Sequence, residues 1–334
     1  MKTLKATSGP KSLFWEGEDL VDPLGGFRRW GPDGQEHDFR PVLSYRFDRA
    51  VRSPSGRWTV VYEERGTKAL LLDGAEIVRE LDRSFYHAEE YDYPVTLGAL
   101  PDGREVLVHC PEQYNNPVVE DTATGERLTP AARYPQDIFH SRLAVSPDGR
   151  RLLSAGWEWY PFGAVQVFDL AAAVAGVAEL DGWGRVSRPQ GLDGEVVAAC
   201  WLDGDRVAVV SGEEVLGDER REDDEEPVAL GPREIGVWSA DGERWLCRSP
   251  LGFTAGTLLA CGGDRVVSLC GHPRLVDART GAVLAEWPEV PVSRREGSYG
   301  VPHVPTPVAA LHPGGVHLAV AVEKGIAILD LPQT

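Results

Sequence analysis

A short turn motif recurs along the chain and constrains its fold more than any other feature. Its clearest copy is Ser146-Pro147-Asp148-Gly149, which lies between an apolar segment at 143–145 and another at 152–155. Pro, Asp and Gly each favour a turn, and short apolar segments on both sides are typical of strands. Similar turns occur at residues 53–56, 100–103, 203–205, 262–264 and 312–315.

Each turn belongs to a larger unit that predicts four strands. A third short strand follows every hairpin, often ending in Asp as at 165–169 and 326–330, and a more polar fourth strand tends to follow it. Units of four strands at a spacing of roughly 45 to 60 residues are typical of β-propeller blades. The expected fold class is therefore all-β, a single β-propeller domain spanning residues 1–334.

The number of blades depends on the N-terminal segment. Six turns predict six four-stranded blades, and the last unit ends after its third strand. The missing strand is expected from the N-terminal closing strand and lead-in at 1–41, through residues 12–15 or 26–30, because an unpaired edge would otherwise remain. The alternative is a seventh blade that contains the first 40 residues.

The repeats resemble the bacterial type of WD40 repeat over nearly the whole chain. The resemblance rests on the segment from Ser146 to Gly156 and on Phe168-Asp169, which stands where that family has Trp-Asp. The repeats are degenerate, since the Gly-His pair and most terminal tryptophans of the family are missing. The resemblance implies a non-enzymatic scaffold or adaptor that binds a protein or peptide partner.

Composition narrows the possible partners and the compartment. The formal net charge is −18, which disfavours unaided binding to nucleic acid or to an anionic membrane surface. No apolar run approaches the 18 residues of a membrane span, and the five cysteines are scattered. We therefore expect a cytoplasmic protein with reduced thiols. Lysine makes up only five of the 34 basic residues, which suggests a GC-rich bacterium.

Aromatic residues, histidines and acids gather in the loops expected on one face of the propeller, around the mouth of its central channel. These loops connect successive blades or join second to third strands, whereas the other face carries only small turn residues. Tyr and Trp are common in binding surfaces, and packing between blades is the alternative role. The predicted partner-binding residues are Phe85, Tyr86, His87, Tyr91, Tyr93, Tyr114, Tyr134, His140, Trp157, Trp159, Tyr160, Tyr299 and His303.

An acidic insertion at 211–233 separates two strands of the fourth unit. Its residues 211–227 contain nine acids and two arginines, so we expect a solvated surface loop or an arm for a basic partner. The acids lack the spacing of a preformed calcium loop, and no metal site is predicted there.

Motifs for catalysis are missing from the sequence. It contains no nucleophile elbow, no phosphate-binding glycine loop and no zinc-type spacing of Cys or His. The sequence leaves catalysis open and favours a non-enzymatic protein without a cofactor. The alternative is a small-molecule enzyme, a metal-assisted hydrolase or lyase, in which His87, His140 and His303 converge at the channel mouth.

Overall fold

Short strands joined by tight turns make up nearly all of the regular structure. A computed structural model describes residues 1–37, 45–130, 133–158, 162–186, 194–215, 230–293, 306–323 and 325–333. None of the helices in these ranges is long and apolar enough to cross a membrane. The elements, in chain order, are β1 (Lys2–Leu4), β2 (Phe14–Glu16), β3 (Asp19–Asp22), β4 (Arg28–Trp30), β5 (Glu36–His37), β6 (Arg49–Arg52), β7 (Trp58–Tyr62), β8 (Lys68–Asp73), β9 (Glu76–Asp82), β10 (Val95–Ala99), β11 (Glu105–His109), β12 (Val118–Asp121), β13 (Ile138–Phe139), β14 (Ala144–Val145), β15 (Arg151–Ser154), β16 (Trp157–Glu158), β17 (Phe162–Gly163), β18 (Gln166–Asp169), α1 (Leu170–Val174), the 3-10 helix η1 (Glu179–Asp181), β19 (Gly194–Trp201), β20 (Arg206–Val215), β21 (Glu234–Ser239), β22 (Arg244–Pro250), β23 (Thr257–Ala260), β24 (Arg265–Cys270), β25 (His272–Asp277), β26 (Val283–Glu286), β27 (Ala309–Leu311), β28 (His317–Val322) and β29 (Gly325–Asp330).

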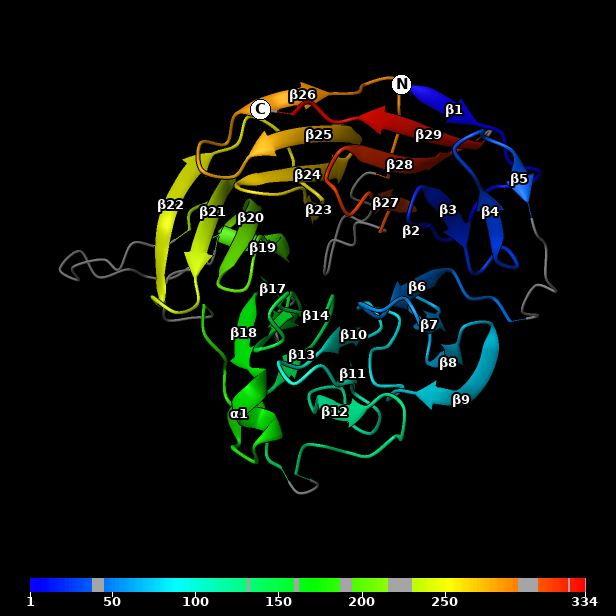
Figure 1. The fold of residues 1–334 in the computed structure, drawn as a ribbon. Helices are drawn as coiled ribbons and strands as arrows, with labels where there is room; N and C mark the ends of the chain where they lie inside the picture. The colour runs from blue at the N-terminus through cyan, green and yellow to red at the C-terminus, as the bar shows by residue number, and fades with distance from the viewer. Residues whose placement is uncertain are drawn as a thin grey trace.

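These strands form antiparallel sheets arranged as a ring (Figure 1). Five sheets each use one continuous part of the chain: β2-β3-β4-β5, β6-β7-β8-β9, β10-β11-β12, β19-β20-β21-β22 and β23-β24-β25-β26. A sixth, β1-β29-β28-β27, joins the first strand of the chain to its last three. The sheets β13-β16-β17 and β14-β15-β18 are successive parts of the same three chain segments and form one blade. The propeller is thus confirmed, and its sheets fit the seven-blade alternative. We number the blades 1 to 7, from β2–β5 to β27–β29.

Hydrophobic clusters lie between neighbouring blades, and each neighbouring pair has one. Phe168 of blade 4, for example, packs with Val106 and Val108 of blade 3. The pair formed by blades 7 and 1 is included, where Trp30 shares a cluster with Ile326. Burial of apolar surface between the blades is the main stabilising term of such a ring.

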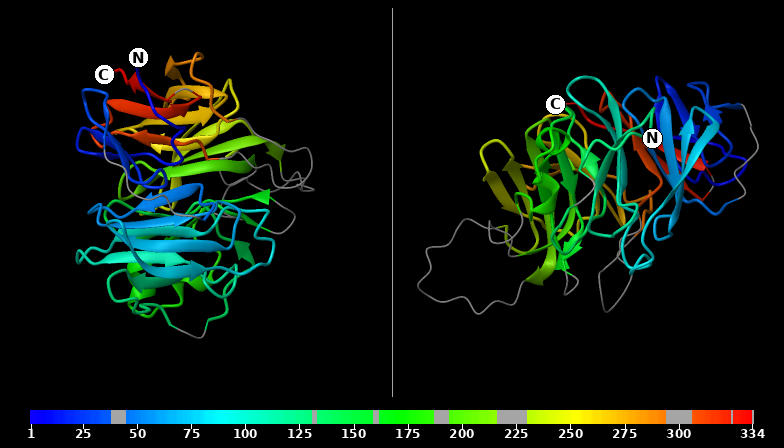
Figure 2. Two further views of the ribbon diagram at one scale, coloured as in Figure 1. Left: turned by 90° about the vertical axis from the view of Figure 1, so that its right-hand side faces the viewer. Right: turned by 90° about the horizontal axis from the view of Figure 1, so that it is seen from below.

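The N-terminal segment differs from the expected arrangement. Residues 12–15 and 26–30 do not complete the last blade, because they contribute to the separate sheet of blade 1. The closing strand is instead β1, in which Lys2 pairs with Ile328 and Leu4 with Ile326 of β29. Strands of two to four residues have too little alternation to stand out in a sequence. The two chain ends consequently lie close together at blade 7 (Figures 1 and 2).

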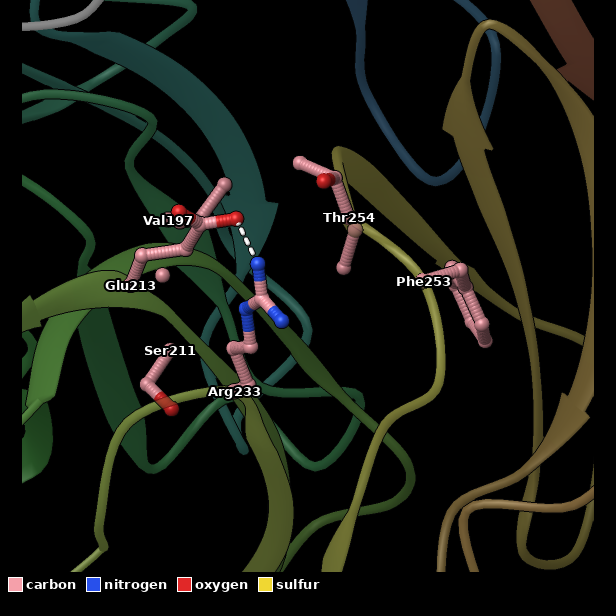
Figure 3. Close-up of a pocket in the computed structure, with 8 residues that line it drawn as sticks. Val197, Ser211, Glu213, Arg233, Phe253 and Thr254 are labelled. Carbon is pink, nitrogen blue, oxygen red and sulfur yellow. Dashed lines mark hydrogen bonds and ion pairs between the residues drawn. The ribbon is translucent and has the colours of Figure 1, made fainter.

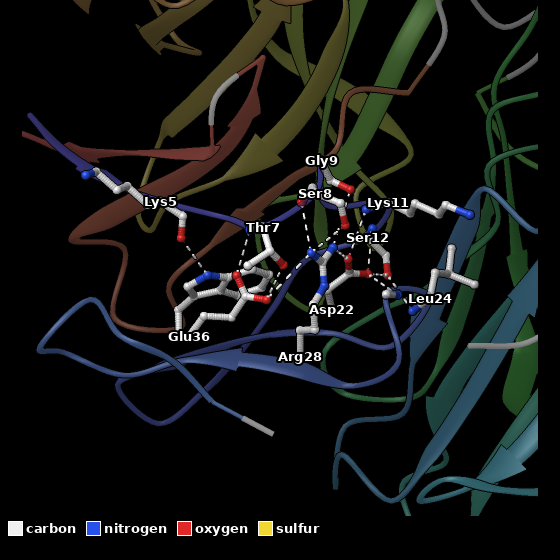
Figure 4. A network of polar contacts seen from close by, with 12 residues as sticks. Lys5, Thr7, Ser8, Gly9, Lys11, Ser12, Asp22, Leu24, Arg28 and Glu36 are labelled. Atoms are coloured by element: carbon white, nitrogen blue, oxygen red, sulfur yellow. Dashed lines mark hydrogen bonds and ion pairs between the residues drawn. The ribbon is translucent and has the colours of Figure 1, made fainter. Parts of the chain in front are cut away.

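A buried ion pair fastens the connection from β1 to β2 onto blade 1 (Figure 4). Asp22 is fully buried and its carboxylate accepts hydrogen bonds from the backbone N–H groups of Lys11, Ser12 and Gly25 at 2.9–3.1 Å. Arg28 Nη2 donates to the same carboxylate at 3.0 Å, and its Nη1 donates to the carbonyl oxygen of Ser8 at 2.9 Å. This network ties the closing segment to the first complete sheet.

Candidate functional site

Aromatic rings from three segments of the channel-mouth face pack around one phenylalanine. Phe139 of β13 is fully buried and lies parallel to Trp157 of β16, with ring centroids 3.9 Å apart. Its other neighbours include Tyr114, from the loop between β11 and β12, at 4.4 Å, and Tyr91 at 5.3 Å. Tyr86 stacks on Tyr114 and Phe139 at 5.0 and 6.0 Å. Such contacts between aromatic rings stabilise the fold by more than the burial of their apolar area alone.

The structure separates the predicted partner-binding residues into two groups. Phe85, Tyr86 and Tyr134 are 79%, 47% and 92% exposed, and the side chains of His87 and Tyr114 are half-buried. We call these five residues the aromatic rim. Trp159, Tyr160, Tyr299 and His303 lie outside the described residues.

The second group is buried. Tyr91, Tyr93, His140 and Trp157 are all at most 5% exposed, so they cannot contact a partner in this conformation. Tyr93 belongs to the cluster between blades 2 and 3, and the other two aromatic residues pack on Phe139. The packing alternative therefore describes these four positions better than direct binding.

Arg83 holds the connection that carries the rim, although the sequence analysis did not select it. Its buried guanidinium donates to the carbonyl oxygens of Gly66 (2.7 Å), Asp92 (3.2 Å), Ala88 (2.5 Å) and Tyr91 (3.1 Å). It also lies 4.5 Å from the ring centroid of Tyr91. Burial lowers the pKa of this guanidinium. An arginine directly before an aromatic run was the only signal in the sequence.

Arg142 links the aromatic connection to blade 5. Its Nε donates to the carboxylate of Asp92 at 2.8 Å, and its Nη1 donates to the carbonyl oxygen of Val197 at 2.6 Å. The backbone of Arg142 has φ = 46°, a conformation that few residues other than glycine adopt. Three blades thus meet at one side chain on the channel-mouth face.

His140 is buried, so one member of the predicted histidine group is not accessible to a substrate. Its Nδ1 lies 3.0 Å from Ser154 Oγ, and both side chains are almost completely buried. A Ser–His pair can form a nucleophile and base, but a substrate cannot reach this one. Among the described residues, no group of His, Cys, Asp or Glu side chains could hold a metal ion.

Burial, together with the nearby charge of Arg133, lowers the pKa of His140 from 6.5 to about 3. Below pH 6.5 the unfolded chain binds a proton at His140 and the folded chain does not. The free energy of unfolding therefore decreases as the pH is lowered, until the pKa of the folded state is reached. The loss is about 1.4 kcal/mol per pH unit, or about 2 kcal/mol at pH 5.

Urea unfolding of the wild type and of His140→Gln at pH 7 and pH 5 checks this prediction. The difference in stability between the two should change by about 2 kcal/mol in favour of the variant at the lower pH. His37→Gln is the control, since the His37 side chain is 59% exposed. Parallel pH profiles for wild type and His140→Gln would contradict the prediction.

A pocket of about 330 Å³ lies between blades 5 and 6, where the segment between β20 and β21 meets the connection from β22 to β23 (Figure 3). Arg233 and Glu213 form an ion pair in it, and Ser211 Oγ donates to the carbonyl oxygen of Gly231 at 2.5 Å. Residues 216–229 of the acidic insertion lie outside the described residues. The lining is Val197, Ser211, Gly212, Glu213, Arg233, Phe253, Thr254 and Ala255.

Comparisons with solved structures place the chain among β-propellers. A chain of the Kuenenia stuttgartiensis hydrazine synthase superposes with a TM-score of 0.61 at 15% identity, over 99% of this chain and 98% of that one. A chain from the crystal structure of the mitotic checkpoint complex superposes with a TM-score of 0.59 at 13% identity, over 99% of this chain and 91% of that one. At such low identity the similarity shows the fold alone. No protein-family model and no curated protein sequence matches the chain.

Proposed function

We propose that this protein is a non-enzymatic, WD40-like propeller scaffold that binds a protein or peptide partner through the aromatic rim. The observation that carries the proposal is the exposure of Phe85, Tyr86 and Tyr134, of which Tyr86 stacks on the buried ring of Phe139. Large aromatic side chains that are already ordered lose little conformational entropy when a partner binds. One neighbour with this fold comes from a multiprotein complex, which is consistent with such a role.

Replacing Tyr86 and Tyr134 together by alanine should weaken partner binding by about tenfold or more, because each substitution removes an exposed anchor. The measurement is quantitative affinity capture from a host extract, followed by titration of the purified partner. Leu246→Ala is the control, since Leu246 is a 39% exposed apolar side chain in β22 of blade 5, outside the segments that carry the rim. A partner that binds the double variant as tightly as the wild type would contradict the proposal.

A second candidate is a small-molecule-binding propeller, including an enzyme that uses His87 and His303. The pocket between blades 5 and 6 favours the binding of a small molecule, because its volume lies in the range of ligand sites, but neither histidine of the enzyme alternative lines it. One of the two neighbours is named as a synthase. Elemental analysis of the purified protein and ligand screening with Arg233→Ala distinguish this candidate from the scaffold.

A further inference from the structure

Four acidic residues lie close in sequence to the aromatic rim, and one of them, Asp137, accepts a hydrogen bond from the hydroxyl of Tyr114. Glu89 and Glu90 follow Phe85 and Tyr86 in one connection, Glu112 precedes Tyr114 in the next loop, and Asp137 follows Tyr134. All four acidic side chains are exposed. We call them the rim carboxylates.

Basic side chains do not offset this charge. The three segments that carry the rim, 84–93, 111–117 and 133–139, contain a single lysine or arginine, Arg133. Its side chain is only 3% exposed and pairs with Asp181, with Nε 2.6 Å from Oδ1. The rim therefore presents apolar ring faces and negative charge to the solvent.

The same connection already binds a cation on its inner side. The guanidinium of Arg83 lies 4.5 Å from the ring centroid of Tyr91 and 5.1 Å from that of Tyr93. Aromatic faces attract Arg and Lys through their quadrupole, and nearby carboxylates add charge-assisted hydrogen bonds. Phe85, Tyr86 and Tyr134 offer these ring faces on the outer side.

We infer that the partner segment recognised by the aromatic rim is a basic peptide, with Arg or Lys side chains held between the exposed rings and the rim carboxylates. This inference rests on the proposed function and specifies the chemistry of its partner. The net charge of −18 acts in the same direction, because it attracts a cationic segment from a distance. The two contributions to binding can be separated, because only the contacts at the rim depend on particular residues, whereas the long-range attraction depends on the net charge.

The test uses the full-length protein and four synthetic peptides of equal length: rich in Arg, rich in Lys, rich in Glu, and neutral. Binding is measured by fluorescence anisotropy at 50 and 300 mM NaCl. The Arg- and Lys-rich peptides should bind, and the other two should not. Glu89→Gln/Glu90→Gln should weaken binding about tenfold, and Tyr86→Ala/Tyr134→Ala by a similar factor at both salt concentrations.

Glu289→Gln/Glu323→Gln is the matched control, because it removes the same charge from exposed positions at blades 6 and 7. It should change the affinity less than twofold. Equal weakening by the Glu89→Gln/Glu90→Gln variant and by the control variant, or binding of the neutral peptide as tight as that of the basic peptides, would overturn the inference. If basic peptides do not bind while partner capture still depends on Tyr86 and Tyr134, the proposed function stands and the basic partner is rejected. If partner capture does not depend on Tyr86 and Tyr134 either, the proposed function and the basic partner are both rejected.

Discussion

Replacing Asp22 by alanine is expected to lower the free energy of unfolding by about 3–5 kcal/mol, because the buried charge of Arg28 loses its nearer carboxylate and keeps only the more distant Glu36, 3.8 Å from its Nη1. The Arg28 side chain is only 3% exposed, so water cannot replace the lost carboxylate. The backbone N–H groups of Lys11, Ser12 and Gly25 lose their acceptor in the same substitution. Since these groups fasten the segment that follows β1, the effect should extend to blade 7.

Urea unfolding measures this effect as a shift of the midpoint. Gly25→Ala provides a second variant without a change of charge, since a Cβ there would lie 2.2 Å from Asp22 Oδ2. Gly9→Ala is the control in the same segment, because its Cβ would meet nothing within 4 Å. An Asp22→Ala midpoint equal to that of the Gly9→Ala control would show that the network does not hold the closing segment.

The second large effect is expected at Arg83. Arg83→Met keeps much of the side-chain volume but removes the donors to four carbonyl oxygens. At about 1 kcal/mol for each lost hydrogen bond, the free energy of unfolding should fall by about 3–4 kcal/mol. The connection that carries Phe85 and Tyr86 would lose its support, so partner binding should weaken as well.

Two measurements distinguish a local loss of ring packing from a loss of the whole fold. Near-UV circular dichroism should lose the signal of the packed rings around Phe139, while far-UV circular dichroism at low temperature retains the strands. Arg104→Ala is the control, because its pair with Asp102 is about half exposed and should contribute less than about 1 kcal/mol. An Arg83→Met variant with wild-type stability and an unchanged near-UV spectrum is the result that excludes this role.

The repeated turns allowed most of the fold to be predicted. Residues 146–149 form the predicted turn, with Val145 paired to Leu152 across it. The strand at 166–169 likewise lies where the apolar pattern put it. Blade 1 was predicted only as the alternative to six blades, because β2 to β5 contain two to four residues each and show little alternation of their own.

The aromatic connections show what local sequence could not decide. Their composition predicted a cluster of rings on the channel-mouth face, and the rings of Tyr86, Tyr91, Tyr114 and Trp157 do pack on Phe139. The same composition could not separate the exposed Tyr86 from the buried Tyr91, five residues later in the same connection. Burial depends on which neighbouring blade covers a ring.

The sequence by itself determined the turns, the strand periods and the charge of the chain, because each depends on residues that are neighbours along it. Only the tertiary structure decided that Lys2–Leu4 completes the last blade and that Arg83 supports the aromatic rim. Both rest on contacts between residues that the sequence separates: Leu4 pairs with Ile326 within the sheet of blade 7, and Arg83 donates to carbonyl oxygens on two loops. Pairings of this kind leave no periodic pattern in either partner, so they become visible only when the blades are in place.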